Sequence, residues 1–390
     1  MYKLHTTCRA CGSTNLEQVA DFGIVPLAND FKKLHEEREG FAPLSVLLCE
    51  RCSLAQLSVV VKPEVLYSNY SYVSSTSKTM LDHMRLLIHD IKQRCHAGTM
   101  VEIGSNTGVL LSVAKDLGFE RIHGIDPAAN LAALANENGI PTTVGVFNRQ
   151  SALECDVRGA DVVVARHVFA HVNDWEGFIN TLDIISNDKT LVVIEVPYVG
   201  DMLDGDEWDS VYHEHLSFVN IKSINALLAK TKWMLQDAKR YSIHGGSIAL
   251  FLRRRDGVFA SVMDDEFSAS DFISSARRWK AKSALLMSEL IRGPRKMIFG
   301  YGAPAKATLW INYLELNSSQ ISFVHDETPQ KQGRFMPGTD IPVIDGRYRM
   351  KDFDTGIVFA WNFADEILAK EKWFTDKGGK FIVPIHTPTK

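Results

Sequence analysis

The fold is decided by one stretch, Met100-Val101-Glu102-Ile103-Gly104-Ser105-Asn106-Thr107-Gly108-Val109-Leu110-Leu111. An apolar strand that carries the acid Glu102 runs into a Gly-rich turn, and an apolar helix follows. Gly104 and Gly108 let the backbone approach a ligand closely, and the first turn of the helix offers free N–H groups. The stretch therefore predicts a cradle for a small ligand at a strand–helix junction.

The next strand sharpens this prediction. It comprises Arg121-Ile122-His123-Gly124-Ile125-Asp126 and ends in an acid about 20 residues after the turn, where a ribose diol would lie. Several nucleotide binders and S-adenosylmethionine (SAM) binders share the G-x-x-x-G spacing, and so do some tight turns with a purely structural role. Together, the turn and Asp126 favour cofactor binding.

Strands and helices alternate through the centre of the chain. Apolar runs alternate with amphipathic segments, which is typical of an α/β fold whose parallel sheet is covered on both faces. The predicted strands are 100–103, 121–125, 160–165 and 191–196, and the predicted helices lie near 79–96, 108–117, 128–138 and 175–185. Because ligands bind at the carboxyl ends of such strands, we expect Glu102, Asp126, His167 and the segment 195–198 around one crevice.

Length and composition are those of a globular protein. The chain has 390 residues, enough for two to three domains, with 45% hydrophobic and 23% charged residues. A formal net charge of -4 gives no general attraction to nucleic acid or to an anionic membrane. No run of 18 apolar residues and no signal-peptide pattern are found, so a cytoplasmic protein without a membrane partner is expected.

The six cysteines fall into two kinds. Cys8-x-x-Cys11 and Cys49-x-x-Cys52 are paired knuckles, which can close a tetrahedral thiolate shell around zinc. Four unrelated buried cysteines would rarely produce two identical spacings. A four-thiolate site leaves no open coordination position, so the zinc is expected to fold an N-terminal module of about 62 residues and not to take part in catalysis. Cys95 and Cys155 are expected to be ordinary thiols.

Two further segments are rich in functional groups. The stretch 67–78 is dense in hydroxyls and aromatics, including Tyr70 and Tyr72, and could either cover a ligand site or merely solvate a surface. Past the fourth strand, Tyr212-His213-Glu214-His215 supplies a base near neutral pH, a carboxylate and a phenol donor. A zinc site on His213 and His215 is the competing interpretation, but it would require histidines four apart. The Gly245-Gly246 turn indicates either a close approach to substrate or a hairpin.

A second α/β alternation occupies the C-terminal part. After a long helix near 263–292, a strand at 296–299 leads into the Gly-rich turn Gly300-Tyr301-Gly302-Ala303-Pro304-Ala305-Lys306. A helix at 307–314 and a strand at 321–324 follow, and the strand runs into His325-Asp326. The turn fits either an NAD site or the nucleotide diphosphate of a substrate.

The zinc knuckles and six motifs after them together resemble one known family. The motifs that follow the zinc knuckles are Val-Glu-Ile-Gly-Ser-Asn-x-Gly, Ala-Arg-His-Val-Phe-Ala-His-Val, Glu-Val-Pro-Tyr, Tyr-His-Glu-His-Leu-Ser-Phe, His-Gly-Gly-Ser and Gly-Tyr-Gly-Ala-x-Ala-Lys. In this order the chain resembles the SAM-dependent sugar C-methyltransferases, which methylate a ring carbon, usually C3, of a nucleotide-linked 4-keto-6-deoxy sugar.

The resemblance implies three domains. A zinc-binding domain would span 1–62. A class I methyltransferase domain with a Rossmann-like fold would span 63–200, with a catalytic extension to about 255. A second Rossmann-like domain that holds the nucleotide-sugar would span 256–390. The implied cofactors are SAM and a structural Zn²⁺, and the implied partner is a nucleotide-linked keto-sugar.

The chemistry of the family suggests roles for individual residues. A ring carbon becomes nucleophilic only after a base removes its proton and a donor steadies the enolate. His215 is the expected base, with Glu214 and Tyr212 polarising and positioning it and stabilising the enolate; His171 and Tyr70 match further family positions near the active site. The expected SAM contacts are Glu102, Gly104, Asn106, Gly108, Asp126 and His167. The expected substrate contacts are Tyr72, Tyr198, Gly302, Lys306 and Asp326.

One departure and two alternatives qualify this picture. The family turn commonly has an acid where this chain has Thr107, which alters a cofactor contact and leaves both glycines intact. An NAD-dependent sugar oxidoreductase would use the Gly300 turn, but no second catalytic cluster accompanies it. A zinc-knuckle protein that modifies nucleic acid is disfavoured by the acidic charge. No motif specifies an oligomeric state.

Overall fold

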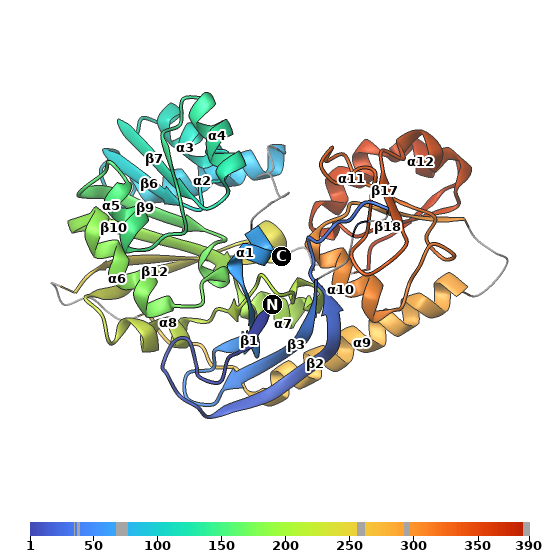
Figure 1. Ribbon diagram of the computed structural model, residues 1–390, viewed down its shortest axis with the longest axis horizontal. Helices are drawn as coiled ribbons and strands as arrows, with labels where there is room; N and C mark the ends of the chain where they lie inside the picture. Colours follow the sequence, from blue (N-terminus) through green and yellow to red (C-terminus); the bar gives the residue numbers. More distant parts are fainter. Residues whose placement is uncertain (35, 37–39, 68–76, 256–261, 292–296, 385–390) are drawn as a thin grey trace.

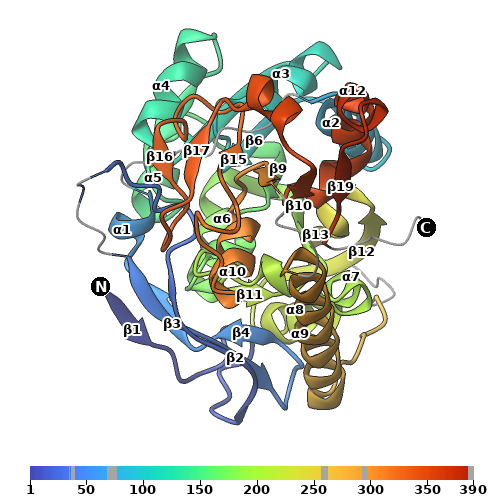
Figure 2. The same cartoon turned by 90° about the vertical axis from the view of Figure 1, so that its right-hand side faces the viewer.

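The computed structural model contains two α/β units and an N-terminal sheet that touches both (Figure 1). It describes residues 1–34, 36, 40–67, 77–255, 262–291 and 297–384. In Figure 1 the first α/β unit lies at the left, the second at the right, and the N-terminal sheet below them. The same parts seen after a quarter turn are shown in Figure 2.

The first α/β unit is built on a seven-stranded sheet of order β12-β13-β10-β9-β6-β7-β8. Its five parallel strands are β6 (Thr99–Ile103), β7 (Arg121–Asp126), β8 (Thr142–Val144), β9 (Ala160–Arg166) and β10 (Ser186–Pro197). All four predicted strands are present, each within a few residues of its expected bounds. The strand order reverses at β6, between β7 and β9, which makes the carboxyl end of β6 the switch point where ligands bind.

Helices form where their apolar faces can cover this sheet. α2 is capped by Ser77, whose side chain accepts a hydrogen bond from the Met80 N–H, and it buries an apolar stripe that includes Met80, Met84 and Leu87. α6 is capped in the same way by Asp174. The helices are α2 (Lys78–Lys92), α3 (Val109–Asp116), α4 (Ala129–Glu137), α5 (Arg149–Glu154) and α6 (Trp175–Ile185).

Two antiparallel strands extend the sheet beyond the sequence prediction. β12 (Trp233–Tyr241) and β13 (Ser247–Arg254) form a hairpin, and β13 pairs antiparallel with β10. The Gly245-Gly246 turn joins them, so the hairpin alternative for this turn is correct. α7 (Val199–Gly205) and α8 (Ile221–Leu228) lie between β10 and this hairpin in the chain.

The N-terminal sheet has the order β11-β4-β3-β2. Three of its strands, β2 (Leu16–Pro26), β3 (Phe41–Cys49) and β4 (Ala55–Leu57), come from the first 57 residues. The fourth, β11 (Ser217–Phe218), comes from the segment just after His215. A separate antiparallel pair joins β1 (Tyr2–Leu4) to β5 (Val59–Val61), and α1 (Pro63–Tyr67) follows.

The second α/β unit has a six-stranded sheet of order β16-β17-β15-β14-β18-β19. It follows the long helix α9 (Ala269–Ile291), and its own switch point is the carboxyl end of β14, between β15 and β18. The strands are β14 (Ile298–Tyr301), β15 (Val324–His325), β16 (Arg334–Phe335), β17 (Pro342–Ile344), β18 (Thr355–Val358) and β19 (Lys380–Ile382), and the helices are α10 (Ala305–Tyr313), α11 (Ala364–Lys370) and α12 (Lys372–Asp376).

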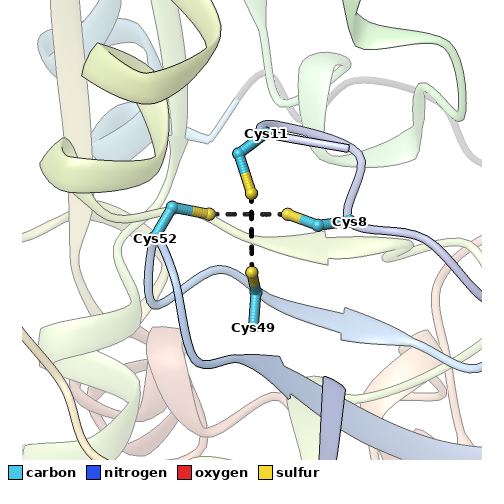
Figure 3. A group of neighbouring side chains, drawn as sticks. All are labelled: Cys8, Cys11, Cys49 and Cys52. Atoms are coloured by element: carbon cyan, nitrogen blue, oxygen red, sulfur yellow. Dashed lines mark hydrogen bonds between the residues drawn. The ribbon is translucent and has the colours of Figure 1, made fainter. Parts of the chain in front are cut away.

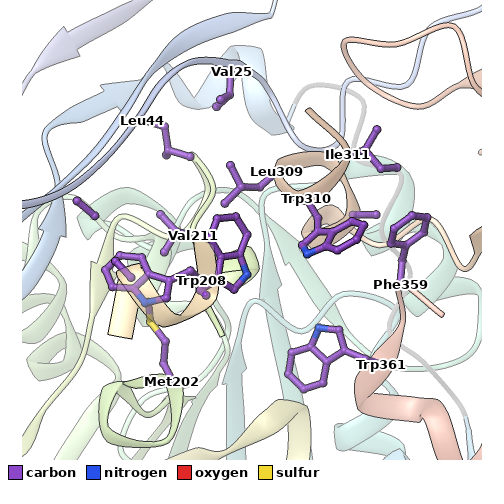
Figure 4. Packing of buried hydrophobic residues seen from close by; sticks show 14 of the residues in the cluster. Val25, Leu44, Met202, Trp208, Val211, Leu309, Trp310, Ile311, Phe359 and Trp361 are labelled. Carbon is purple, nitrogen blue, oxygen red and sulfur yellow. The ribbon is translucent and has the colours of Figure 1, made fainter. Parts of the chain in front are cut away.

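One hydrophobic core joins the N-terminal sheet, the segment 199–218 and the second α/β unit. Leu44 from the N-terminal sheet, Trp208 after α7 and Trp310 from α10 belong to the same buried cluster (Figure 4). Trp361, from the loop after β18, completes it and donates a hydrogen bond from its indole N–H to Asp209 Oδ2 at 2.7 Å. This shared core holds the second α/β unit against the segment 199–218.

Some residues named in the sequence analysis fall outside the described ranges. Tyr70 and Tyr72 lie outside the described residues, as does the first residue of the strand predicted at 296–299. Over the described ranges, none of the helices is long and apolar enough to cross a membrane.

Candidate active site

The cradle after β6 has the tight geometry that its glycines require. Gly104 has φ +71°, and a Cβ there would lie 2.1 Å from Val168 Cγ2. Gly108 adopts a left-handed conformation at the N-cap of α3, where no side chain caps the helix, so the helix N–H groups remain available. Asn106, at φ +52°, donates its backbone N–H to Asp126 Oδ2 at 2.7 Å, which ties the turn to the end of β7.

Acidic groups surround this cradle. Glu102 is buried, and burial raises the pKa of its carboxyl to about 8, despite the opposing charge of Arg166. Burial also raises the pKa of Asp126. Within the described part of the chain, Glu102 Oε2 has no hydrogen-bond partner. Two buried carboxyls, one with an unused acceptor oxygen, offer hydrogen-bonding groups to a polar ligand that carries a ribose.

Four histidines converge next to the cradle. The rings of His167 and His244 lie 4.8 Å apart, and those of His171 and His215 lie 5.2 Å apart, measured between ring centroids. Burial lowers the pKa of each, to about 4 for His171 and about 3 for His244, and well below the usual value for His167 and His215. All four imidazoles are therefore neutral at pH 7.

His215 is held in one tautomer. Its Nδ1 lies 2.7 Å from the Ser210 carbonyl oxygen, which can only accept, so Nδ1 carries the proton. Nε2 is then a lone-pair acceptor, and the Tyr212 hydroxyl donates to it at 2.8 Å. The structure thus joins the predicted base and the predicted phenol directly, and the Nε2 atom is the basic one.

The neighbours of His215 point towards the N-terminal sheet. His213 Nε2 donates to the Pro43 carbonyl at 3.1 Å, and Glu214 Oε1 accepts from Asn29 Nδ2 at 2.6 Å. His213 and His215 therefore face different partners. Tyr198 is also engaged elsewhere, because its hydroxyl donates to Asp265 Oδ2 at 2.7 Å.

Sequence reasoning placed Glu195 near the ligand without assigning it a role, and it did not single out His83 or His244 as functional side chains. His83 Nε2 lies 2.5 Å from Glu195 Oε1, and Glu195 Oε2 lies 3.9 Å from His167 Nε2. His83 occupies the apolar stripe of α2, three residues after Met80, and a polar residue at such a position was the one signal that could have revealed it.

The second Gly-rich turn faces the same region. Gly302 has φ +81°, and the backbone N–H of Ala303 donates to Asp326 Oδ2 at 2.7 Å. Lys306, in the first turn of α10, places its ammonium 3.8 Å from the centroid of the Trp361 ring, and this buried Nζ has no hydrogen-bond partner among the described residues. Its charge contributes to lowering the pKa of His215, after burial and His171.

The two units meet at this point. Asn362, after β18, places its Nδ2 3.2 Å from His244 Nδ1. The contacts of Asn362 and of Trp361 bring the carboxyl end of β18 against His244 and Asp209. The switch points of the two sheets consequently open towards one cluster of ionisable groups.

The four knuckle cysteines gather into one site (Figure 3). Their sulfurs all lie within 4.8 Å of one another, with Cys8 and Cys52 at 3.4 Å and Cys11 and Cys49 at 3.6 Å. A tetrahedron with Zn–S bonds of about 2.3 Å has edges of about 3.8 Å. The site fits zinc as predicted from the spacing.

Comparisons with known families agree with this architecture. Residues 8–67 match a zinc binding domain, residues 80–235 a methyltransferase domain, and residues 242–386 a C-methyltransferase C-terminal domain. Two solved structures are similar over part of the chain: the PH0226 protein of Pyrococcus horikoshii OT3 (13% identity, TM-score 0.38, 48% of this chain and 98% of that chain), and the plantazolicin methyltransferase BpumL in complex with SAH (12%, 0.35, 45% and 84%).

Fold and site together define a SAM-dependent methyltransferase of class I with a zinc-binding domain. SAM supplies a methyl group from its sulfonium when it is bound. The chain is 32% identical over 406 aligned residues to the C-methyltransferase NovU of Streptomyces niveus, with 98% of this chain and 96% of that protein covered. It belongs to this family of C-methyltransferases, so the alternatives of an oxidoreductase and of a nucleic-acid-modifying protein are set aside.

Proposed function

We propose that this C-methyltransferase methylates C3 of a nucleotide-linked 4-keto-6-deoxy sugar. The observation that carries the proposal is the convergence of the two Gly-rich turns on the pair of Tyr212 and His215. One turn lies beside the buried carboxyls of Glu102 and Asp126 and suits SAM, whereas the other carries the buried ammonium of Lys306, which has no hydrogen-bond partner among the described residues and suits a diphosphate. A nucleotide-sugar held there would extend its sugar towards His215.

The tautomer of His215 supports its role as the base. The Ser210 carbonyl fixes the proton on Nδ1, so Nε2 is the basic atom. It would accept the C3 proton either directly, once the Tyr212 hydroxyl turns from Nε2 to the enolate oxygen, or through that hydroxyl. A 4-keto group makes that proton acidic, and Tyr212 is suited to donate a hydrogen bond to the enolate oxygen. The His171 ring lies tilted beside that of His215 and would confine it, while Glu214 would position the segment through Asn29.

The remaining contacts are assigned by position. We assign the ribose of SAM to Asp126, its amino-acid end to Gly104 and Gly108 with Glu102 beneath, and contacts beside it to Asn106 and His167. For the nucleotide-sugar, Gly302, Lys306 and Asp326 would hold the nucleotide, with Tyr70, Tyr72 and Tyr198 as further candidates. Zinc-binding, methyltransferase and nucleotide-sugar domains would follow the boundaries 1–62, 63–255 and 256–390, in a cytoplasmic enzyme.

The substrate class is tested by product analysis. The enzyme is incubated with SAM and thymidine- or uridine-diphosphate 4-keto-6-deoxyhexoses, and the products are examined by mass spectrometry and NMR. We expect a mass gain of one methyl group and a new carbon–carbon bond at C3. Methylation on oxygen, or at another ring carbon, would contradict the proposal.

The base is tested by exchange of the C3 proton with D₂O in the absence of methyl transfer. His215→Asn should abolish exchange and lower kcat by about 10² to 10⁴, because Asn cannot accept the proton. His89→Asn, on the exposed side of α2, is the matched control and should exchange normally. Undiminished exchange in His215→Asn would remove this residue from the role of base.

A further inference from the structure

The loop 210–218, which carries Tyr212 and His215, is fastened to the N-terminal sheet on its far side. β11 pairs antiparallel with β4, joining Ser217 to Gln56 and Phe218 to Ala55. The backbone N–H of Leu57 also donates to the carbonyl of Leu216 at 2.9 Å. Together with the contacts of His213 and Glu214 described above, these bonds make the zinc-bearing module the support of the loop.

Arg9 is at the centre of this support. It lies between Cys8 and Cys11 in the first zinc knuckle and is 7% exposed. Its Nη1 donates to the carbonyl of Leu216 at 3.1 Å and to that of Leu57 at 3.3 Å. Its Nε donates to Asn173 Oδ1 at 3.1 Å. One guanidinium therefore bridges the residue after His215 and a residue two positions after His171.

The Arg9 guanidinium connects the two segments that carry His171 and His215, whose rings lie tilted beside each other. The spacing of 5.2 Å between the rings of His171 and His215 depends on how their segments are held relative to each other. A guanidinium is planar and presents its donors in a fixed fork, so it sets this relative position more rigidly than a single contact could. A misplacement of about 1 Å in such a site can cost about 100-fold in rate.

Charge links the bridge to the metal site. The three acceptors of the Arg9 side chain are two carbonyls and one amide, all uncharged. A buried cation is costly unless opposite charge lies nearby. A zinc ion with four thiolates carries a net charge of about -2, so the loaded knuckle that flanks Arg9 supplies the compensating charge.

We propose that Arg9 is a positioning residue for methyl transfer, through which the zinc knuckle fixes His215 against His171. This inference rests on the proposed role of His215. It extends the purely structural function expected for the zinc, because the knuckle then influences turnover as well as folding.

The test compares zinc-loaded variants. Arg9→Met keeps the length of the side chain and removes every donor, and Arg9→Lys keeps the charge but has no planar fork. Lys230→Met is the matched control: Lys230 Nζ donates to the carbonyl of Cys11 at 3.1 Å, so it touches the same knuckle without touching the loop 210–218. Zinc content, melting temperature, Kd for SAM, KM, kcat and C3 exchange are measured for each.

The positioning role predicts a split between kcat and KM. Arg9→Met should keep its zinc and its Kd for SAM within about twofold, while kcat and the exchange rate fall together by about tenfold or more. Arg9→Lys should recover part of the loss, and Lys230→Met should keep the parent kcat. If Arg9→Met fails to fold, Asn173→Ala replaces it in the test. Asn173 is exposed, and this change removes one of the acceptors of the Arg9 guanidinium, so kcat and the exchange rate should fall by a smaller factor.

Two results would overturn the proposal. The first is a zinc-loaded Arg9→Met with parent kcat and exchange, or, where that variant fails to fold, an Asn173→Ala with parent values. The second is a Lys230→Met with the same loss as Arg9→Met, which would assign the effect to the knuckle's stability. Failure of the proposed function can be told apart from failure of this inference, because it would appear as undiminished exchange in His215→Asn, whatever the Arg9 variants do.

Discussion

The two Gly-rich cradles share one backbone design and differ in charge. In both, the acid after the next strand accepts a backbone N–H from the turn at 2.7 Å: Asp126 from Asn106, and Asp326 from Ala303. Each acid also accepts the N–H of the residue two positions later, at 2.8 Å for Asp126 and 2.9 Å for Asp326. The glycines that open the two turns, Gly104 and Gly302, both have positive φ.

The charged groups around the two cradles differ. Two positions before Gly104 the β6 strand has Glu102, and two positions before Gly302 the β14 strand has Gly300. Four positions after Gly104 and Gly302, the β6 cradle has Gly108 and the β14 cradle has Lys306. Burial opposes the ionisation of Asp326, but the Lys331 ammonium and hydrogen bonds outweigh it and lower its pKa, whereas burial alone raises the pKa of Asp126.

Because the two turns share a backbone but not their charged neighbours, a Gly-rich turn specifies how closely a ligand can approach and not which ligand binds. A cradle with two buried carboxyls favours a ligand that offers a ribose to hydrogen-bond, and a cradle with a buried lysine favours a diphosphate. Substitutions in one cradle at a time test whether each cradle binds its own ligand.

The largest effect is expected from the opening glycines. Gly104→Ala places a Cβ 2.1 Å from Val168 Cγ2 at positive φ, so it should cost about 1–3 kcal/mol of stability and weaken SAM binding by about 100-fold or more. Gly302→Ala meets Ala360 Cβ at 2.8 Å and should cost similar stability, raise KM for the nucleotide-sugar and leave the Kd for SAM unchanged. Calorimetric SAM titration with thermal unfolding checks both, and equal loss of SAM affinity would refute the division of ligands.

A smaller effect is expected from the two acids. Asp126→Asn removes a charged acceptor for the ribose and should weaken SAM binding by about 10- to 100-fold. Asp326→Asn is the matched change in the other cradle, and it should raise KM for the nucleotide-sugar without altering the Kd for SAM. SAM titration of both variants under one buffer provides the measurement, and an unaltered Kd in Asp126→Asn would exclude the ribose contact.

A third effect is the pH dependence of stability that Glu102 gives to the β6 cradle alone. Its pKa of about 8 lies above the ordinary value of 4.5, so the folded protein retains a proton that the unfolded chain releases between these values. Glu102 therefore makes the free energy of unfolding fall as pH rises from about 5 to about 8. Glu102→Gln should remove this slope, with urea unfolding at several pH values as the measurement; parallel curves for parent and variant would contradict it.

Much of the fold could be predicted because its signals are local. β6, β7, β9 and β10 are apolar runs bounded by turns, and the zinc ligands are two identical short spacings. β12 was missed because its sequence, Trp233–Tyr241, mixes polar and apolar residues on a partly covered edge of the sheet. His83 was missed because nothing near it in the chain indicates that α2 would bring it to Glu195, 112 positions away.

By itself, the sequence determined the α/β alternation, the two cradles and the zinc knuckles, because periodicity, glycines and cysteine spacing act over a few neighbouring residues. Only the tertiary structure decided that the switch points face each other, and that Arg9 reaches Leu216 across 207 positions of chain. Such contacts depend on how separate units pack around a shared core, and no local pattern encodes that packing.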